Sequence, residues 1–325
     1  MNKTMKKWFI AAAILIFSGL ILFSAVMSVY GWDFSRLGSE NYETNTKIIA
    51  EDFKDISINT KTSDILFLPS EDGECRVVCY EEKKAAHEVY VEDGALRIDI
   101  NDERAWYDLV GFGFQSPKIT VYLPKDEYGT LTLNATTGDV DLPKDFSFKA
   151  MDLALTTGDV KSAALVEEKA KITLSTGDVR IENTRLGSLE LSMSTGRLGL
   201  FGVVCLGDIN VSHTTGDARL NGVDCRSLIM DGSTGDTDMT GVIAEKEFRI
   251  TTSTGDVEFS ACDAAEIFIK TDTGDVEGSL LSEKVFIIRT TTGDIEVPKT
   301  DKGGRCEIIT TTGDIEIDLS RRAYN

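Results

Sequence analysis

The chain has 325 residues and is acidic: 54 Asp and Glu against 34 Lys and Arg give a formal net charge of −20. No nucleic-acid partner is expected, because phosphate backbones are bound by clustered Lys and Arg. The apolar fraction of 42% is too high for a disordered acidic chain. With only two His residues, little material remains for His-based catalysis or His-rich metal sites. The composition therefore predicts a folded protein that is not an enzyme and has no resident cofactor.

The first thirty residues predict a membrane anchor. Residues 8–30 carry no charged side chain, and a helix of this length spans about 35 Å, enough to cross a bilayer. Three lysines precede the span (Lys3, Lys6 and Lys7), which by the positive-inside rule places residues 1–7 in the cytoplasm and the bulk of the chain outside it. A cleaved signal peptide is the alternative, although its apolar core normally has only about 7–15 residues. The expected localisation is the cell membrane, with a single pass.

A repeat organises the second half of the chain. Thr-Gly-Asp occurs nine times, and Thr195-Gly196-Arg197 fills the one gap in the series. Successive glycines are 19 or 20 residues apart, which defines ten units. The glycines are Gly138, Gly158, Gly177, Gly196, Gly216, Gly235, Gly255, Gly274, Gly293 and Gly313. Glycine suits a tight corner because it adopts φ > 0 without steric cost.

Each unit predicts two short strands around its corner. The fifth and seventh residues before the glycine are apolar in all ten units, as in Leu191 and Leu189. Apolar residues also dominate the second and fourth positions after it, as in Val179 and Ile181. This period-two pattern gives each strand one buried face. Because one coil cannot bury that face alone, the units should stack in register as an all-β, parallel β-helix-like solenoid of about ten coils, over residues 131–320.

The segment between the anchor and the repeats should cap the solenoid. Residues 31–46 are polar and predict a stalk, whereas residues 47–130 contain short strands separated by Gly-containing turns. Thr62-Ser63-Asp64-Ile65 resembles a degenerate Thr-Gly-Asp-Val corner, so this region includes an irregular first coil. Capping is needed because an open solenoid end exposes unpaired backbone and apolar surface. Residues 321–325 form a polar tail.

The six cysteines show no zinc-binding spacing. Those within the repeats occupy core positions and are expected to be small buried hydrophobes. Cys205 and Cys225 follow their glycines by nine residues in adjacent coils, so the spacing also permits a disulfide between them.

The corners predict a column of aspartates about 4.8 Å apart, in which neighbouring charges repel by about 0.9 kcal/mol in water. Arg197 falls between Asp178 and Asp217 and should relieve both. Towards the C-terminus a second acidic column runs beside the first. We call the two the acidic stripe: Asp256, Glu258, Asp275, Glu277, Asp294, Glu296, Asp314 and Glu316. One hypothesis is that the stripe binds Ca²⁺ or a basic partner; the favoured alternative is a solvated face that confers solubility.

The corner phrase Ala-Thr-Thr-Gly-Asp-Val, the segment Ile65-Leu66-Phe67-Leu68-Pro69-Ser70 and the strand Ile119–Lys125 together resemble a known bacterial family. It is the β-strand-repeat family of unknown function labelled "putative adhesin", whose members are often single-span envelope proteins. The resemblance covers about residues 45–320 and implies a solenoid-like fold and an envelope location. It implies no catalytic residues. Arg197 departs from the usual acidic corner.

These observations predict a membrane-anchored, extracytoplasmic and non-catalytic surface module. Its expected partners are the membrane and an envelope protein, surface protein or glycan. Two alternatives are an accessory protein of envelope-stress signalling, as some relatives are, and a polysaccharide-active β-helix enzyme. The second is disfavoured because the acids follow the repeat and no coil carries an exceptional constellation.

Overall fold

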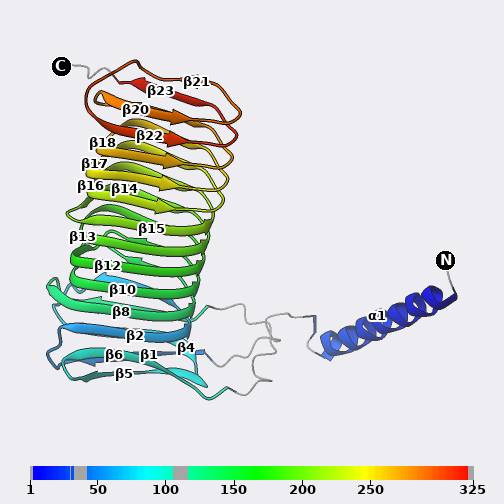
Figure 1. Ribbon diagram of the computed structural model, residues 1–325. Helices are drawn as coiled ribbons and strands as arrows, with labels where there is room; N and C mark the ends of the chain where they lie inside the picture. The colour runs from blue at the N-terminus through cyan, green and yellow to red at the C-terminus, as the bar shows by residue number, and fades with distance from the viewer. Residues whose placement is uncertain (1–2, 30, 33–41, 105–115, 321–325) are drawn as a thin grey trace.

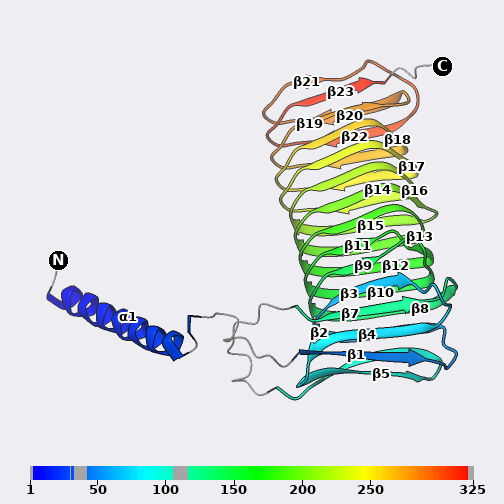
Figure 2. The same cartoon turned by 180° about the vertical axis from the view of Figure 1, so that it is seen from behind.

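The computed structural model describes residues 3–29, 31–32, 42–104 and 116–320. Its strands stack into one elongated solenoid (Figures 1 and 2). Most of the predicted stalk, residues 33–41, and the predicted tail, residues 321–325, lie outside the described residues.

Helix α1, Lys3–Val29, contains most of the predicted membrane span and begins five residues before it. The part from Met5 to Val29 is long and apolar enough to cross a membrane. Most of its side chains are exposed among the described residues: Leu15 is 72% exposed and Phe17 68% exposed. By length and composition α1 fits either a membrane span or a signal sequence.

Seven strands precede the repeats and close one end of the solenoid. β2 and β3 form the predicted first coil, because Thr62 pairs with Thr137 and Ile65 with Val140 of the next coil. β4 is antiparallel to β7 and β1, and β5 is antiparallel to β6. The bounds are β1 Tyr42–Ile49, β2 Asp55–Thr62, β3 Asp64–Pro69, β4 Cys75–Glu82, β5 Ala85–Glu92, β6 Ala95–Asp102 and β7 Lys118–Leu123.

β1 differs from the sequence-based prediction. Residues 42–46 were expected to be stalk, yet they pair with β4 along its whole length. The reason is that β1 is an exposed edge strand, which is held by backbone hydrogen bonds and needs no apolar face except at Ile49. A polar composition therefore does not distinguish it from a linker.

The repeats form the remaining strands, all paired in parallel with the coils above and below (Figure 1). These are β8 Glu127–Thr137, β9 Val140–Leu142, β10 Ser147–Thr157, β11 Val160–Ser162, β12 Leu165–Thr176, β13 Val179–Thr195, β14 Leu198–Cys205, β15 Asp208–Thr215, β16 Ala218–Asp231, β17 Thr237–Thr251, β18 Val257–Lys270, β19 Val276–Leu280, β20 Lys284–Arg289, β21 Ile295–Glu296, β22 Gly304–Ile309 and β23 Ile315–Leu319.

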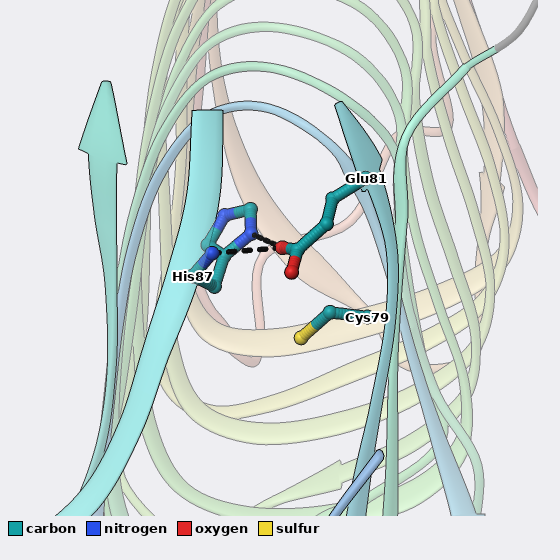
Figure 3. Close-up of side chains that lie close together, drawn as sticks. All are labelled: Cys79, Glu81 and His87. Carbon is teal, nitrogen blue, oxygen red and sulfur yellow. Dashed lines mark hydrogen bonds and ion pairs between the residues drawn. The ribbon is translucent and has the colours of Figure 1, made fainter. Parts of the chain in front are cut away.

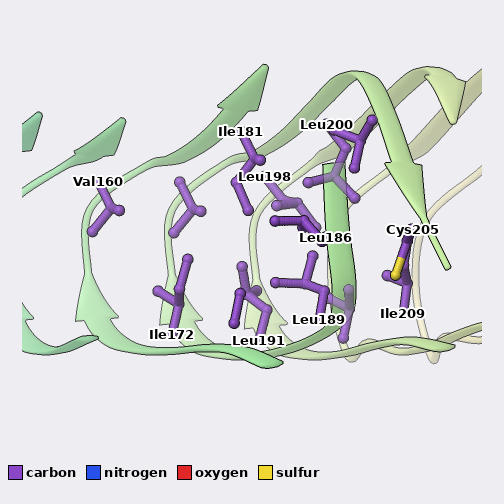
Figure 4. Packing of buried hydrophobic residues seen from close by; sticks show 14 of the residues in the cluster. Val160, Ile172, Ile181, Leu186, Leu189, Leu191, Leu198, Leu200, Cys205 and Ile209 are labelled. Atoms are coloured by element: carbon purple, nitrogen blue, oxygen red, sulfur yellow. The ribbon is translucent and has the colours of Figure 1, made fainter. Parts of the chain in front are cut away.

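Apolar columns fill the interior, as the period-two pattern predicted (Figure 4). Ile172 pairs with Leu153 on one side and Leu191 on the other, and each is less than 2% exposed. Figure 4 shows Val160 and Ile181 pointing inward from one wall, and Ile172 and Leu191 pointing inward from the facing wall. Since full burial of one such side chain contributes about 1.5–3 kcal/mol, the columns supply the main stabilising term of the rod.

A second corner, six residues after the glycine, was not predicted. In five consecutive coils this residue adopts a left-handed conformation with φ between 50° and 61°. The five residues are Asn183, Gly202, Gly222, Gly241 and Ala261. Because Asn and Ala occupy two of these positions, the sequence shows no uniform glycine signal there.

The last two coils stack in the reverse of their order along the chain. β22 lies between β18 and β20, and β23 lies between β19 and β21 (Figure 2). The coil around Gly313 is therefore inserted between those around Gly274 and Gly293. Nothing in the repeat predicts this reversal, because every coil offers its neighbours the same corner and the same apolar columns.

Two glycines at different corners give a matched test of the stacking geometry. A Cβ on Gly235 would lie 2.1 Å from the carbonyl oxygen of Gly216, whereas Gly241 has no heavy atom within 4 Å of the corresponding position. Both have positive φ. We expect Gly235→Ala to lower the free energy of unfolding by about 3–5 kcal/mol, and Gly241→Ala by about 1 kcal/mol, in urea titrations followed by circular dichroism. Equal losses would show that backbone conformation alone, not coil contact, requires the first corner.

Candidate functional site

The corner aspartates hold successive coils together. At most neighbouring corners the backbone N–H of one Asp donates to Oδ1 of the Asp in the adjacent coil, as from Asp275 to Asp256 at 2.8 Å. Arg197 donates its N–H to Asp178 in the same way but offers no carboxylate to Asp217. Asp139 makes the same bond to Asp64 of the irregular first coil. These hydrogen bonds cross between coils. One oxygen of each acceptor carboxylate is thus committed to the fold.

The acidic stripe comes together as predicted, in an order altered by the inserted coil. Glu258 pairs with Glu277, Glu277 with Glu316, and Glu316 with Glu296. The corner column follows the same order, Asp256, Asp275, Asp314 and Asp294, through its N–H bonds. The glutamates Glu258, Glu277 and Glu316 line an open groove of about 570 Å³ together with polar side chains such as Ser260 and Ser279.

The pKa of Glu277 reflects the carboxylates gathered in this groove. Partial burial, and then the negative charges of Glu316 and Glu258, raise the pKa of Glu277 above its ordinary value. Carboxylate oxygens are ligands that Ca²⁺ prefers. The arrangement can therefore attract cations electrostatically, while the Oδ1 atoms of Asp256, Asp275 and Asp314 are already hydrogen-bonded.

Basic residues compensate the aspartate column in the middle coils. Arg197 pairs with Asp178, with 2.6 Å between its guanidinium and the carboxylate. This pair lowers the pKa of Asp178 against the opposing effect of burial. Asp217, which was expected to be relieved as well, feels Arg197 only through space. Arg219 similarly pairs with Asp238 at 2.8 Å, at the edge of the groove.

A second cluster, missed by the sequence analysis, lies inside the capped end of the solenoid. Cys79 and Glu81 of β4 and His87 of β5 point toward one another (Figure 3). One potential ligand atom from each lies within 4.8 Å of the others. His87 Nδ1 is 2.6 Å from Glu81 Oε2, and both side chains are 1% exposed. The missed signal was the alternation along β4: Glu81 falls at the same alternate positions as the buried residues Cys75, Val77 and Cys79, which predicts that this acid is buried too.

The hydrogen bonds of this cluster favour a structural role over a metal site. We call Glu81, His87 and the polar groups bonded to them the polar plug, because they close the end of the solenoid interior. Glu81 accepts from the ring and the backbone N–H of His87, and from Asn45 at 2.8 Å. The other ring nitrogen of His87 lies 2.8 Å from the Thr60 hydroxyl. Burial, with a smaller effect of Glu81, raises the pKa of the Cys79 thiol to about 12, although a metal ligand must be a thiolate. The donor set of a metal site is present, but its atoms are already used.

The other histidine, His213, belongs to no cluster of potential metal ligands among the described residues. Its ring is buried among the coils, with neither nitrogen hydrogen-bonded within the described residues. Burial lowers the pKa of His213, so the neutral ring is favoured. All six cysteines, including Cys205 and Cys225, are buried free thiols. The disulfide that the spacing permitted does not form in this structure.

Glu81→Gln tests the plug. Burial alone would raise the pKa of Glu81, but the hydrogen bonds from His87 and Asn45 outweigh it and lower the pKa below its ordinary value. Its stabilising effect is therefore present above about pH 4.5 and lost as the pH falls through the folded-state pKa. We expect Glu81→Gln to cost about 1.5–3 kcal/mol of unfolding free energy at pH 7, and less in acid, in urea titrations.

Glu88→Gln is the matched control, because Glu88 lies next to His87 on β5 with an exposed side chain. It should change stability by less than about 0.5 kcal/mol. An increase in melting temperature with one equivalent of Zn²⁺, abolished by Cys79→Ser, would contradict the plug and establish a metal site instead.

Several solved structures are similar to this chain over most of its length. A putative adhesin from Parabacteroides merdae ATCC 43184 shares 14% identity at a TM-score of 0.43, covering 74% of this chain and 97% of that one. A putative adhesin from Bacteroides fragilis NCTC 9343 shares 12% at 0.34, covering 87% and 98%. A putative lipid binding protein from Parabacteroides distasonis ATCC 8503 shares 14% at 0.41, also covering 87% and 98%.

The curated proteins include no match to this chain. The model of one domain family, Toastrack DUF4097, matches residues 53–209 and 203–325, which together take in nearly all of the solenoid. The repeat-family resemblance seen in the sequence is thereby confirmed. The chain belongs to the Toastrack DUF4097 family.

Proposed function

We propose that this protein is a membrane-anchored, extracytoplasmic β-solenoid that acts as a non-catalytic, adhesin-like interaction module of the cell envelope. The observation that carries the proposal is the pairing of a filled, acidic rod with a long apolar helix most of whose side chains are exposed in the described part of the chain. Lipid is the remaining environment that removes those side chains from water.

The interior of the rod supports a surface function. Its apolar columns run through the stack without giving way to a ligand chamber in the described coils, and the Cys79–Glu81–His87 cluster is sealed and hydrogen-bonded. The corner aspartates follow the repeat and accept backbone hydrogen bonds from the adjacent coil. Recognition of an envelope protein, a surface protein or a glycan would then use the flank or the end of the rod, and we propose that no catalytic residue or resident cofactor is involved.

The anchor and its orientation can be tested by cysteine labelling in cells. Because the six native cysteines are buried, a membrane-impermeant maleimide should label only an introduced cysteine. We expect Leu206→Cys, 58% exposed on the rod, to react on intact spheroplasts. Met5→Cys, 51% exposed before the span, should react only after the membrane is permeabilised.

The anchor should also depend on its apolar length. Leu15→Arg with Leu22→Arg costs about 3 kcal/mol per substitution in a membrane span, so the double variant should leave the carbonate-resistant membrane fraction. Leu206→Arg on the rod should remain in it. A wild-type product that is soluble and lacks its first 28 residues would replace the anchor with a cleaved signal.

We propose that the acidic stripe is a solvated face and not a built Ca²⁺ site. Its carboxylates repel one another by about 0.9 kcal/mol per neighbouring pair in water, so any salt that screens them should stabilise the rod slightly. Thermal melts in 2 mM CaCl₂ should therefore match those in NaCl of equal ionic strength. A Ca²⁺-specific rise in melting temperature that disappears in Glu277→Gln with Glu316→Gln would reverse this conclusion.

A further inference from the structure

The two ends of the solenoid are built differently. At the first end, antiparallel strands β1, β4 and β5 cover the opening, and the Glu81–His87 pair closes the interior. At the far end, β20 pairs only with β22 and β21 only with β23 among the described strands. The outer edges of β20 and β21 therefore have no strand beside them in the part of the chain that the structure describes.

The apolar core is uncovered at this far end. The second residue after the corner glycine is at most 3% exposed in the other nine units, yet Ile295 is 48% exposed. Phe286 and Ile288, which continue core columns, are only partly buried, and Val285 beside them is 40% exposed. We call β20, β21 and these side chains the open end. Its coil has the side chains of an interior coil but lacks a neighbour on one face.

The backbone of the open end also has the pattern of an interior coil. Elsewhere the corner glycine donates its N–H to a threonine carbonyl of the next coil, as Gly274 does to Thr312 at 3.0 Å. The residue two positions later donates to an aspartate carbonyl in the same way, as Val276 does to Asp314 at 2.9 Å. Gly293 and Ile295 have no such acceptor among the described residues. An uncovered edge of this kind is a template for another β-strand.

We infer that the open end pairs with the open end of a second copy of this chain. A head-to-tail stack is disfavoured because the opposite end presents the antiparallel strands β1 and β5 and not a coil of the repeat. A two-fold axis makes one edge complementary to itself and gives a closed dimer. With the axis parallel to the strands, β20 of one copy lies antiparallel over β21 of the other, and the contact is made twice.

The charges at the open end favour a second copy of this chain as its partner. β20 ends in the exposed Arg289, while the adjoining corner and β21 carry Asp294 and Glu296; the other base of β20, Lys284, is buried and paired with Asp263. The two-fold arrangement brings Arg289 of each copy toward the acids of the other. Across residues 284–303 there are four basic and three acidic residues, whereas the whole chain has a net charge of −20. Open ends can therefore approach each other without the repulsion that two acidic flanks would meet.

The pairing itself does not depend on the proposed function, but its biological meaning does. Because α1 precedes the closed end in the chain, each rod is connected to its helix at the closed end. A dimer joined at the open ends therefore has its two closed ends, and the connections to the two helices, on opposite sides of the joint. If the protein is anchored as proposed, such a dimer is suited to joining two facing membranes. Dimerisation in detergent can succeed even if membrane anchoring fails in cells, so the two ideas are tested separately.

The full chain in detergent should be dimeric by light scattering coupled to size-exclusion chromatography. We expect Val285→Lys with Ile295→Lys to weaken the dimer at least about tenfold, because lysine on a β-edge opposes pairing. Val204→Lys with Leu206→Lys is the matched control: these side chains are 42% and 58% exposed on the flank of the rod, and their replacement should leave the dimer intact. A monomeric wild type, or a dimer equally stable in both variants, would overturn the inference.

Spin labels distinguish end-to-end pairing from association through α1. A nitroxide on Ile295→Cys should report a short dipolar distance between copies, and one on Leu206→Cys should not. The native thiols are buried and stay unlabelled. This measurement also decides the matter if the double-lysine variant fails to fold, and the absence of a short distance at Ile295 would refute the pairing.

Discussion

The whole structure depends on how closely neighbouring coils approach at the Thr-Gly-Asp corner. A Cβ on Gly196 would lie 1.9 Å from the carbonyl oxygen of Gly177, and the other corners are similarly tight. Glycine therefore sets the spacing of the stack. Once that spacing is set, the Asp carboxylate reaches the N–H of the next coil, and the apolar columns fall into register. The acidic surface is in this sense a by-product of the fold, since the carboxylate is there to accept a backbone hydrogen bond.

The third residue after the glycine has no such structural role, and the charge on the surface of the rod varies at this position. It is basic at Lys161, Arg180 and Arg219 in the middle coils and acidic from Asp238 onward. Arg180 also stacks on the ring of Phe201, with 4.3 Å from its guanidinium carbon to the ring centroid. Toward the far end the described coils carry no base at this position, and burial together with the neighbouring carboxylates raises the pKa of Glu277. The scaffold is uniform, whereas the charge along its flank is not.

Features that follow from one coil were predictable from sequence, and features that depend on relations between coils were not. The phase of the glycines and the alternation around Leu191 define strands, corner and core without any structure. The interchange of the last two coils leaves no trace in the sequence, because Ile308 and Ile288 are equivalent partners for Ile269 in the same column. The plug was missed for another reason: a glutamate at the end of an alternating strand is normally solvated, and only the fold brings His87 to Glu81.

A stack of equivalent coils has no intrinsic end, so each end must be specified by a departure from the repeat. The first end has many such departures: antiparallel pairing, a hairpin with Asp93 and Gly94 at positive φ, and the buried, hydrogen-bonded Glu81–His87 pair. The far end has few. Its coil keeps the corner phrase, the inward Ile288 and the inward Ile295 of an interior coil, and the interchange of coils leaves it outermost. A coil that retains interior chemistry at a solvent boundary is costly to leave uncovered, and the most economical cover is another coil of the same kind.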